Sequence, residues 1–138
     1  MARRLGIAAA FAAAAAAISL LVYGVGRLAG GSYRFTTGAA PAEVDAVTVA
    51  GFSFVPLFLG LAVVAVVGRL SKAALVVGPV LALGTIVLMT LPADFDGVSK
   101  TALAICHVML VPVIVLAVRT MARTSRPVTA GTTVSSPR

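Results

Sequence analysis

The chain has 138 residues, of which 60% are apolar and 11% are charged, and its formal net charge is +7. Average soluble domains are about half apolar and about a quarter charged, so this composition excludes an ordinary soluble domain. It indicates instead that the lipid bilayer is the solvent. The single cysteine, Cys106, excludes an internal disulfide and any paired-cysteine zinc or redox motif.

Four apolar runs are long enough to cross a hydrocarbon core of about 30 Å, which needs roughly 20 helical residues. They cover residues 5–26, 47–67, 73–91 and 101–118. We therefore predict an all-α transmembrane fold, a four-helix membrane bundle over residues 1–119 without a separate soluble domain.

The first run follows a short basic start, Met1-Ala-Arg-Arg4, as a signal peptide would. However, the apolar core of a signal peptide covers only about 7–15 residues. Here the run continues from residue 5 to residue 26 and closes with glycines and Arg27. This length favours a retained first helix over a cleaved signal.

The connection over residues 27–46 is the longest loop, with glycines at positions 30 and 31 as helix breakers. Tyr33 and Phe35 within it are expected at the membrane interface, where amphipathic aromatic side chains are enriched. A tight turn over residues 68–72 leads into the third helix. That helix carries small residues at intervals of four, a stripe suited to close helix contact: Ala74, Gly78 and Ala82.

The tail over residues 120–138 is rich in Thr, Ser, Pro and Arg and lacks apolar periodicity. Such a segment cannot bury enough apolar surface to order itself. We therefore expect it to be disordered.

The basic residues lie mostly on one side of the predicted spans, and positively charged loops stay in the cytoplasm. Both termini are therefore expected in the cytoplasm, with loops 27–46 and 92–100 outside a cell membrane. The charge of +7 then faces the anionic inner leaflet, so the lipid bilayer is the expected partner rather than nucleic acid. The cytoplasmic side has Arg3, Arg4, Arg69, Lys72, Arg119, Arg123, Arg126 and Arg138, and the outer side has Arg27, Arg34, Lys100 and all four acidic residues.

A short motif occurs twice, at residues 41–48 and 92–99, and four of its eight positions are identical. An offset of 51 residues aligns the second predicted helix with the fourth without a gap. This pattern indicates two parallel helical-hairpin repeats, helices 1–2 and helices 3–4. The alternative is that Asp45 and Asp96 recur only because both cap a helix N-terminus.

His107 is the only ionisable residue clearly inside a predicted span, about 9–14 Å from the outer end of its helix. Ionisable groups at this depth are costly and often functional. The structural alternative starts from Pro56, which aligns with His107 and has no N–H for the carbonyl of Phe52. We predict that a ring N–H of His107 bonds that carbonyl or the hydroxyl of Ser53.

The four acidic residues are the other candidates for function: Glu43, Asp45, Asp94 and Asp96. Their oxygens would suit an outward-facing Ca²⁺ or Mg²⁺ site, but they lack the spacing of an EF-hand loop. The favoured interpretation is that they are solvated carboxylates that cap helices. No metal and no cofactor is therefore expected.

Cys106 beside His107 does not form a catalytic pair, because neighbouring residues on a helix point about 100° apart. The sequence also contains no Ser-His-Asp arrangement, no phosphate-binding glycine loop and no paired carboxylates within a span. We therefore expect a protein that is not an enzyme.

The chain resembles a family of uncharacterised small four-span membrane proteins common in actinobacteria. The resemblance rests on the length, the Ala/Val-rich spans, Pro92-Ala93-Asp94 before the last helix, and His107 followed by Pro112. This family has no established activity to carry over. The chain is also similar to small multidrug exporters, but only in size and span count. Those proteins use a glutamate in their first helix, and residues 5–26 contain no acid.

The sequence leaves two functions open. The first is a non-enzymatic structural, accessory or partner-binding component of the cell membrane, as a homo-oligomer or with other membrane proteins. The second is a small transporter or channel, with His107 lining a path and the four acids forming an outer vestibule. The two differ in whether His107 and the acids converge on one cavity.

Overall fold

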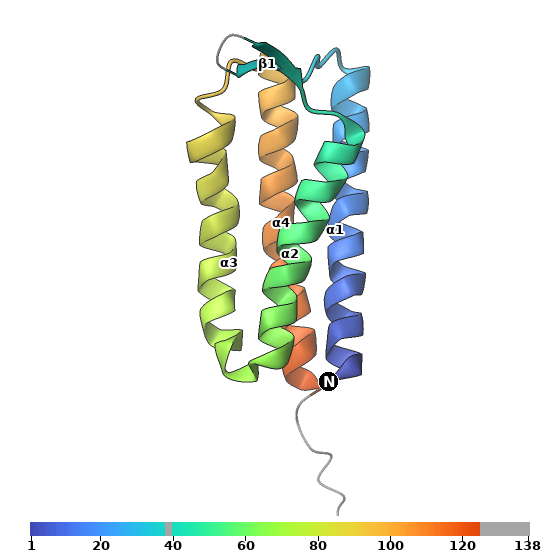
Figure 1. Ribbon diagram of the computed structural model, residues 1–138, viewed down its shortest axis with the longest axis vertical. Helices are drawn as coiled ribbons and strands as arrows, with labels where there is room; N and C mark the ends of the chain where they lie inside the picture. Colours follow the sequence, from blue (N-terminus) through green and yellow to red (C-terminus); the bar gives the residue numbers. More distant parts are fainter. Residues whose placement is uncertain (38–39, 125–138) are drawn as a thin grey trace, which may run out of the picture.

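The computed structural model describes residues 1–37 and 40–124 and consists of four long helices that run alternately up and down (Figure 1). The helices are α1 (Ala2–Leu28), α2 (Ala46–Val66), α3 (Ser71–Thr85) and α4 (Gly97–Arg123). A 3₁₀ turn, η1 (Gly68–Leu70), joins α2 to α3, and a π-helical turn, η2 (Ile86–Thr90), prolongs α3. Four helical segments are long and apolar enough to cross a membrane, which confirms the predicted four-helix membrane bundle.

The last helix is longer than predicted, because α4 continues to Arg123. The prediction that the disordered tail begins at residue 120 is therefore wrong. The physical reason is Met121, whose side chain is fully buried in the main core cluster and holds the last helical turn against the bundle. The rest of the predicted tail, residues 125–138, lies outside the described part of the chain.

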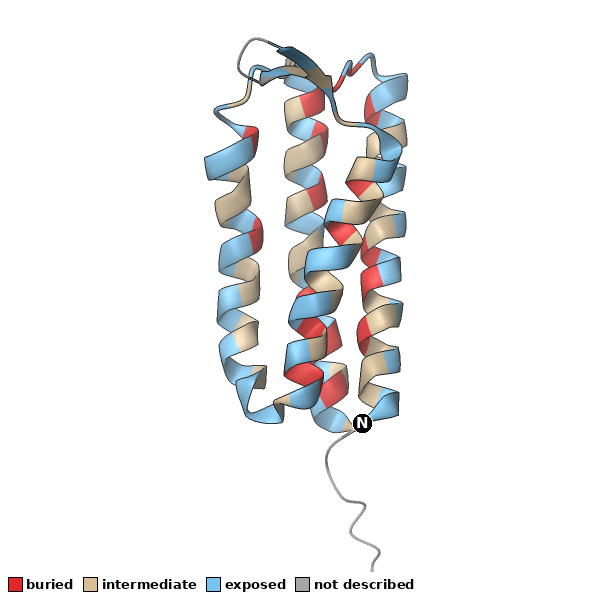
Figure 2. Cartoon of the chain, viewed as in Figure 1, coloured by how far each residue is buried: buried red, intermediate tan, exposed pale blue. Residues whose placement is uncertain are grey.

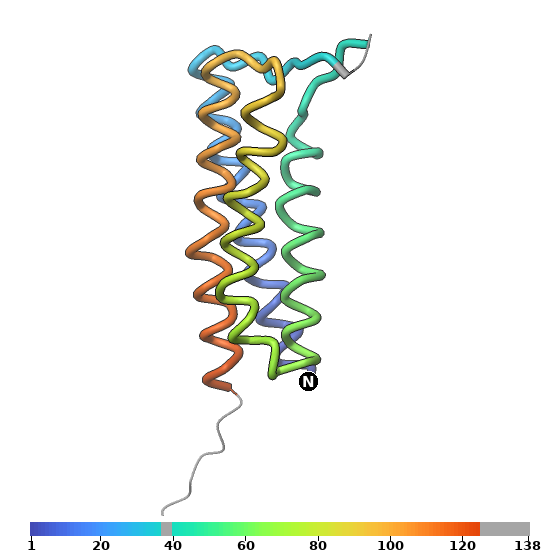
Figure 3. Tube along the Cα trace, turned by 90° about the vertical axis from the view of Figure 1, so that its left-hand side faces the viewer, coloured from blue at the N-terminus to red at the C-terminus, as the bar shows by residue number. Residues whose placement is uncertain are grey.

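The connection from α1 to α2 contains a two-stranded antiparallel hairpin, which the sequence pattern did not predict. Its strands are β1 (Arg34–Thr37) and β2 (Ala40–Glu43), with Arg34 opposite Glu43 and Phe35 opposite Ala42. This connection lies across one end of the bundle, which we call the hairpin end (Figure 3). The opposite end, where Met1 and the last turn of α4 lie, is the terminal end.

Helix α1 packs against both α2 and α4 through its small residues. Its buried positions recur every three, four or seven residues, so they form one stripe along the helix. Small side chains let helix backbones approach closely, which is how membrane helices gain contact without a hydrophobic driving force between them. Figure 2 shows the buried residues along α1, α2 and α4. On α1 they are Ala8, Ala12, Ala15, Ser19 and Gly26.

Helix α3 packs against α4 but scarcely touches α2, although a short turn joins the two. Its contact with α4 uses the predicted stripe of small residues. Ala82 is buried, and a Cβ atom added to Gly78 would lie 2.8 Å from Cγ2 of Ile114. The expected close contact along this stripe is thus confirmed at its centre.

Two parallel hairpin repeats related by an ideal two-fold axis would make α2 and α3 touch as closely as α1 and α4 do. Instead, α1 and α4 pack together while α2 and α3 diverge. The two halves are therefore not equivalent in packing, whatever the origin of the repeated motif.

We expect Gly78→Leu to lower the thermal unfolding temperature of the purified protein. Extra methylene groups forced into a packed contact typically cost about 1–3 kcal/mol. The matched control is Gly84→Leu on the same helix, because nothing lies within 4 Å of a Cβ atom at that position. Equal unfolding temperatures for the two variants would show that the α3–α4 contact is not tight.

Candidate functional site

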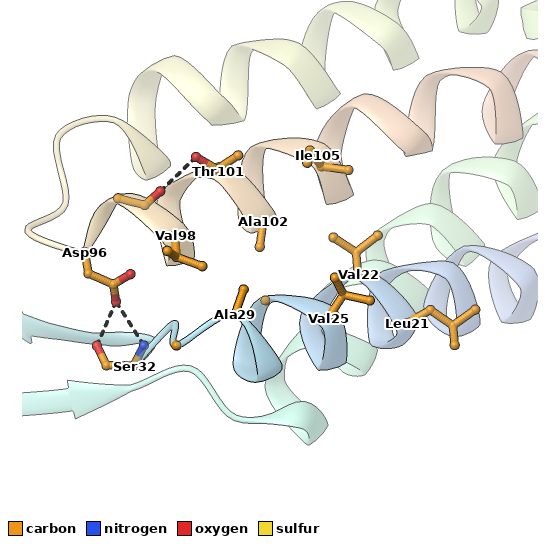
Figure 4. Close-up of a pocket in the computed structure, with 13 residues that line it drawn as sticks. Leu21, Val22, Val25, Ala29, Ser32, Asp96, Val98, Thr101, Ala102 and Ile105 are labelled. Atoms are coloured by element: carbon orange, nitrogen blue, oxygen red, sulfur yellow. Dashed lines mark hydrogen bonds between the residues drawn. The ribbon is translucent and has the colours of Figure 1, made fainter.

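Asp96 joins two distant parts of the chain at the hairpin end. It is the N-cap of α4, where Oδ1 accepts a hydrogen bond from the backbone N–H of Ser99 at 2.8 Å. Its Oδ2 accepts from the Ser99 hydroxyl at 2.6 Å and from the backbone N–H and hydroxyl of Ser32 at 3.0 and 2.8 Å. Figure 4 shows this carboxylate bridging the start of α4 and the segment after α1.

These four donors explain the electrostatics of Asp96. Hydrogen bonds to the ionised form favour that form, so the Ser99 and Ser32 groups hold the pKa of Asp96 far below its usual range. Asp45 plays the simpler part of the same motif: it caps α2 by accepting from the Thr48 N–H at 2.7 Å. The predicted capping role of both aspartates is therefore confirmed.

Asp94 fixes the hairpin to the connection between α3 and α4. It accepts from the backbone N–H of Thr36 at 2.8 Å and from the Thr36 hydroxyl at 2.7 Å. These bonds lower the pKa of Asp94. Beside them, the rings of Phe35 and Phe95 pack with centroids 4.9 Å apart.

Glu43 forms ion pairs within the connection from α1 to α2. Its carboxylate lies 3.1 Å from a guanidinium nitrogen of Arg27 and 3.4 Å from one of Arg34. Both pairs are exposed, and exposed pairs contribute about 0–1 kcal/mol each. Arg27 also donates to the carbonyl of Ser32, so it orders the segment that Asp96 holds.

Tyr33 lies at the centre of this arrangement and is fully buried. Its ring therefore packs against protein, and its depth relative to the membrane interface stays a prediction. Its N–H donates to the Ser99 hydroxyl at 2.9 Å, its hydroxyl donates to the Tyr23 carbonyl at 3.2 Å, and the two tyrosine rings are 4.4 Å apart. Burial raises the pKa of Tyr33 to about 12.

The backbone of Tyr33 has a φ of 56°, an uncommon value for a residue other than glycine. Such a conformation persists only where the surroundings determine it from several sides. Here the two hydrogen bonds and the ring contact supply that constraint. The pattern of apolar residues does not indicate a positive φ at Tyr33, so this turn could not be predicted from the sequence.

An open groove of ≈ 930 Å³ lies between α1 and α4 in their halves toward the hairpin end, beneath these contacts. Figure 4 shows Asp96 and Ser32 at one end of the groove and apolar side chains along its walls. The oxygens of Asp96 that face this region already accept four hydrogen bonds. The groove is therefore an apolar surface with a saturated carboxylate at its rim.

His107 lies elsewhere, in a cleft of ≈ 410 Å³ between α2, α3 and α4, which we call the lateral cleft. Phe52, Ser53 and Pro56 line the same cleft as His107. The predicted hydrogen bond is wrong, however. Nδ1 of His107 is 2.8 Å from the carbonyl oxygen of Leu103, one turn back on the same helix, which the ring reaches more easily than α2.

The partner of Nδ1 defines the tautomer of the neutral ring. A carbonyl oxygen can only accept, so Nδ1 carries the hydrogen and Nε2 of the neutral ring holds a lone pair. His107 and Asp96 line different cavities, and neither Glu43, Asp45 nor Asp94 lines either of the two. The structure thus brings the acids together at the hairpin end but keeps His107 apart from them.

Cys106 is buried and points to a different neighbour from His107. Its sulfur lies 3.7 Å from the carbonyl oxygen of Ser19 on α1. Since His107 bonds within α4, the two adjacent side chains share no hydrogen bond. Among residues 1–37 and 40–124, no group of three or more His, Cys, Asp or Glu side chains is placed to hold a metal ion.

Gly26→Ala is expected to loosen the contact between α1 and α4. A Cβ atom at Gly26 would overlap the Tyr33 hydroxyl and lie 2.9 Å from Cβ of Ala102, so Tyr33 would have to leave its site. Thermal unfolding and amide hydrogen exchange at Ser99 would report the change. Gly24→Ala, with open space at its Cβ position, is the matched control and should behave as the wild type. If the amide of Ser99 exchanged at the wild-type rate in both variants, the placement of Tyr33 would be contradicted.

Acid should weaken the contribution of Asp96 only below the ordinary carboxyl pKa of 3.8. A lowered pKa in the folded state means that this contribution is complete above the unfolded value and is lost as pH falls through the folded value. We expect Asp96→Asn to lower the unfolding temperature by a few degrees near neutral pH. The difference from the wild type should shrink only at pH values below about 4.

Glu43→Gln is the control for Asp96→Asn, because it removes an exposed carboxylate from surface ion pairs. It should change the unfolding temperature less than Asp96→Asn does. A difference for Asp96→Asn that already declines near neutral pH would contradict the described hydrogen bonds.

Comparison with known proteins leads to one family. No curated protein and no solved structure matches the chain. Residues 1–124 match a family described as "Family of unknown function (DUF6069)". This match covers all four helices, the hairpin and both cavities. The chain is therefore a member of the DUF6069 family of unknown function, and its four apolar helices make it a multi-pass membrane protein.

Proposed function

We propose that the protein is a non-enzymatic component of the cell membrane that binds a membrane-resident partner in the lateral cleft. Both termini lie in the cytoplasm in this proposal, and the acidic loops 27–46 and 92–100 lie outside. The observation that carries it is the separation of α2 from α3, which leaves a cleft open from the side of the bundle. A partner dissolved in the bilayer would enter this cleft without crossing the membrane.

The roles of the polar residues support a binding function over a catalytic one. Each of the four acids accepts hydrogen bonds or ion pairs that hold the hairpin end together. Cys106 and His107 bond to separate carbonyl groups. The polar groups at the hairpin end thus have structural partners, and the lateral cleft presents a surface for contact.

A small transporter or channel is the second candidate, favoured by the position of His107 in the lateral cleft. The acidic vestibule of this second candidate lacks support. Asp96 lines the groove between α1 and α4 rather than the lateral cleft, and all four acids already accept hydrogen bonds or form ion pairs. Proton and cation flux into liposomes, with His107→Ala as the variant, tests this candidate. Flux that depends on His107 would favour it over the first proposal.

The partner-binding proposal is tested with a photo-crosslinking residue at two adjacent positions of α3. Both side chains are exposed, but Val77 lines the lateral cleft and Val76 does not. After irradiation of membranes from cells that make the protein, mass spectrometry should find a defined adduct at Val77. At Val76 it should find only the mixture expected of bulk lipid. Matching adduct spectra at the two positions would overturn the proposal.

A further inference from the structure

Ser53 on the lining of the lateral cleft has a hydroxyl without a hydrogen-bond partner in the described part of the chain. The residue is only 8% exposed. Other hydroxyls on the helices donate to the carbonyl four residues back, as Thr85, Thr101 and Thr120 do. Ser53 has no such bond, so its hydroxyl is available to a molecule in the cleft.

His107 offers a second group on the same lining. Its Nδ1–H donates to Leu103, and this is the one hydrogen bond of the ring within residues 1–37 and 40–124. Nε2 of the neutral ring is therefore an acceptor without a partner. The carbonyl of Phe52, next to Ser53 in sequence, is a third group. It lacks its regular helical donor because Pro56 has no N–H.

These groups lie in the half of the lateral cleft toward the hairpin end. Ser53 lies in the first half of α2 and His107 in the first half of α4. Both of these helices begin at the hairpin end. The hydroxyl-bearing Thr85, at the last residue of α3, lines the same half of the cleft. The half toward the terminal end is lined by apolar residues such as Leu61, Val64 and Val118. The cleft is thus polar at one end and apolar along the rest of its length.

The remaining lining contains no Asp, Glu, Lys or Arg. A charged head group would therefore have no counter-ion in the cleft, and uncompensated charge at membrane depth is costly. The favoured head group is neutral, donates one hydrogen bond to Nε2 of His107 and accepts one from the hydroxyl of Ser53. A single hydroxyl group does both.

We propose that the lateral cleft binds a lipophilic alcohol or phenol, with its hydroxyl between His107 and Ser53 and its apolar tail toward the terminal end. The volume of ≈ 410 Å³ lies within the range of about 300–1,000 Å³ that small-molecule sites occupy. This inference rests on the proposed function, since it names the chemical class of the partner.

The first test compares para-nonylphenol with its O-methyl ether on the full chain in lipid nanodiscs. The ether keeps the tail and the acceptor oxygen but cannot donate to Nε2. We expect the ether to bind about tenfold more weakly, as the loss of one hydrogen bond implies. The chain has one histidine, so ¹⁵N-labelled histidine gives one ring, whose Nε2 resonance should shift with the phenol. Equal affinities, or an unshifted Nε2 resonance, would overturn the proposal.

The second test uses two conservative variants. Ser53→Ala should weaken phenol binding several-fold, because the hydroxyl of the ligand loses its donor. Ser19→Ala is the matched control, since the Ser19 hydroxyl is also buried without a partner but lines neither cavity. Equal phenol affinity in both variants would contradict the proposed site.

The outcomes separate this inference from the proposed function. A defined adduct at Val77 together with equal affinities for phenol and ether would leave partner binding in place and reject the hydroxyl ligand. If that adduct at Val77 were with a second copy of this chain, again with equal affinities, the conclusion would be the same. Matching adducts at Val77 and Val76 with equal affinities would reject both.

Discussion

The structure depends on one carboxylate, that of Asp96, which accepts four hydrogen bonds from two segments more than sixty residues apart. It begins α4 and at the same time holds the chain that leaves α1. With this segment fixed, Tyr33 is seated between the two helices, and its unusual backbone conformation is maintained by its surroundings. The close contact of α1 with α4 at the hairpin end follows from these bonds.

The same contacts explain why the bundle is asymmetric. The connection between α1 and α2 is long enough to form a hairpin and to reach Asp94 and Asp96 on the far side of the end. The turn between α2 and α3 is short and fixes only the adjoining ends of its two helices. Between these helices no tyrosine is inserted and no carboxylate bridges them, so the lateral cleft separates them. Two halves with a shared sequence motif thus pack differently, because α1 contacts α4 while α2 scarcely touches α3.

Much of this architecture is predictable because each feature has a local cause. The spans follow from apolar length, the caps from Asp45 and Asp96, and the α3–α4 contact from small residues at intervals of four. Aligning the two motifs pairs His107 with Pro56, and both residues line the lateral cleft. The hairpin, the burial of Tyr33 and the bond from His107 to Leu103 were missed, because each depends on contacts or rotamers that periodicity does not encode. Thr48 and Ser99, each three residues after a capping aspartate, are partners that spacing alone identifies.

Helix α3 departs from regular α geometry at both of its ends, with a 3₁₀ turn at one and a π-helical turn at the other. Such irregular turns are where helices change direction most easily. Between them, α3 is a short rod that one neighbour, α4, holds along a stripe of small side chains. The width of the lateral cleft beside α2 is therefore set by the angle at which α3 packs against α4.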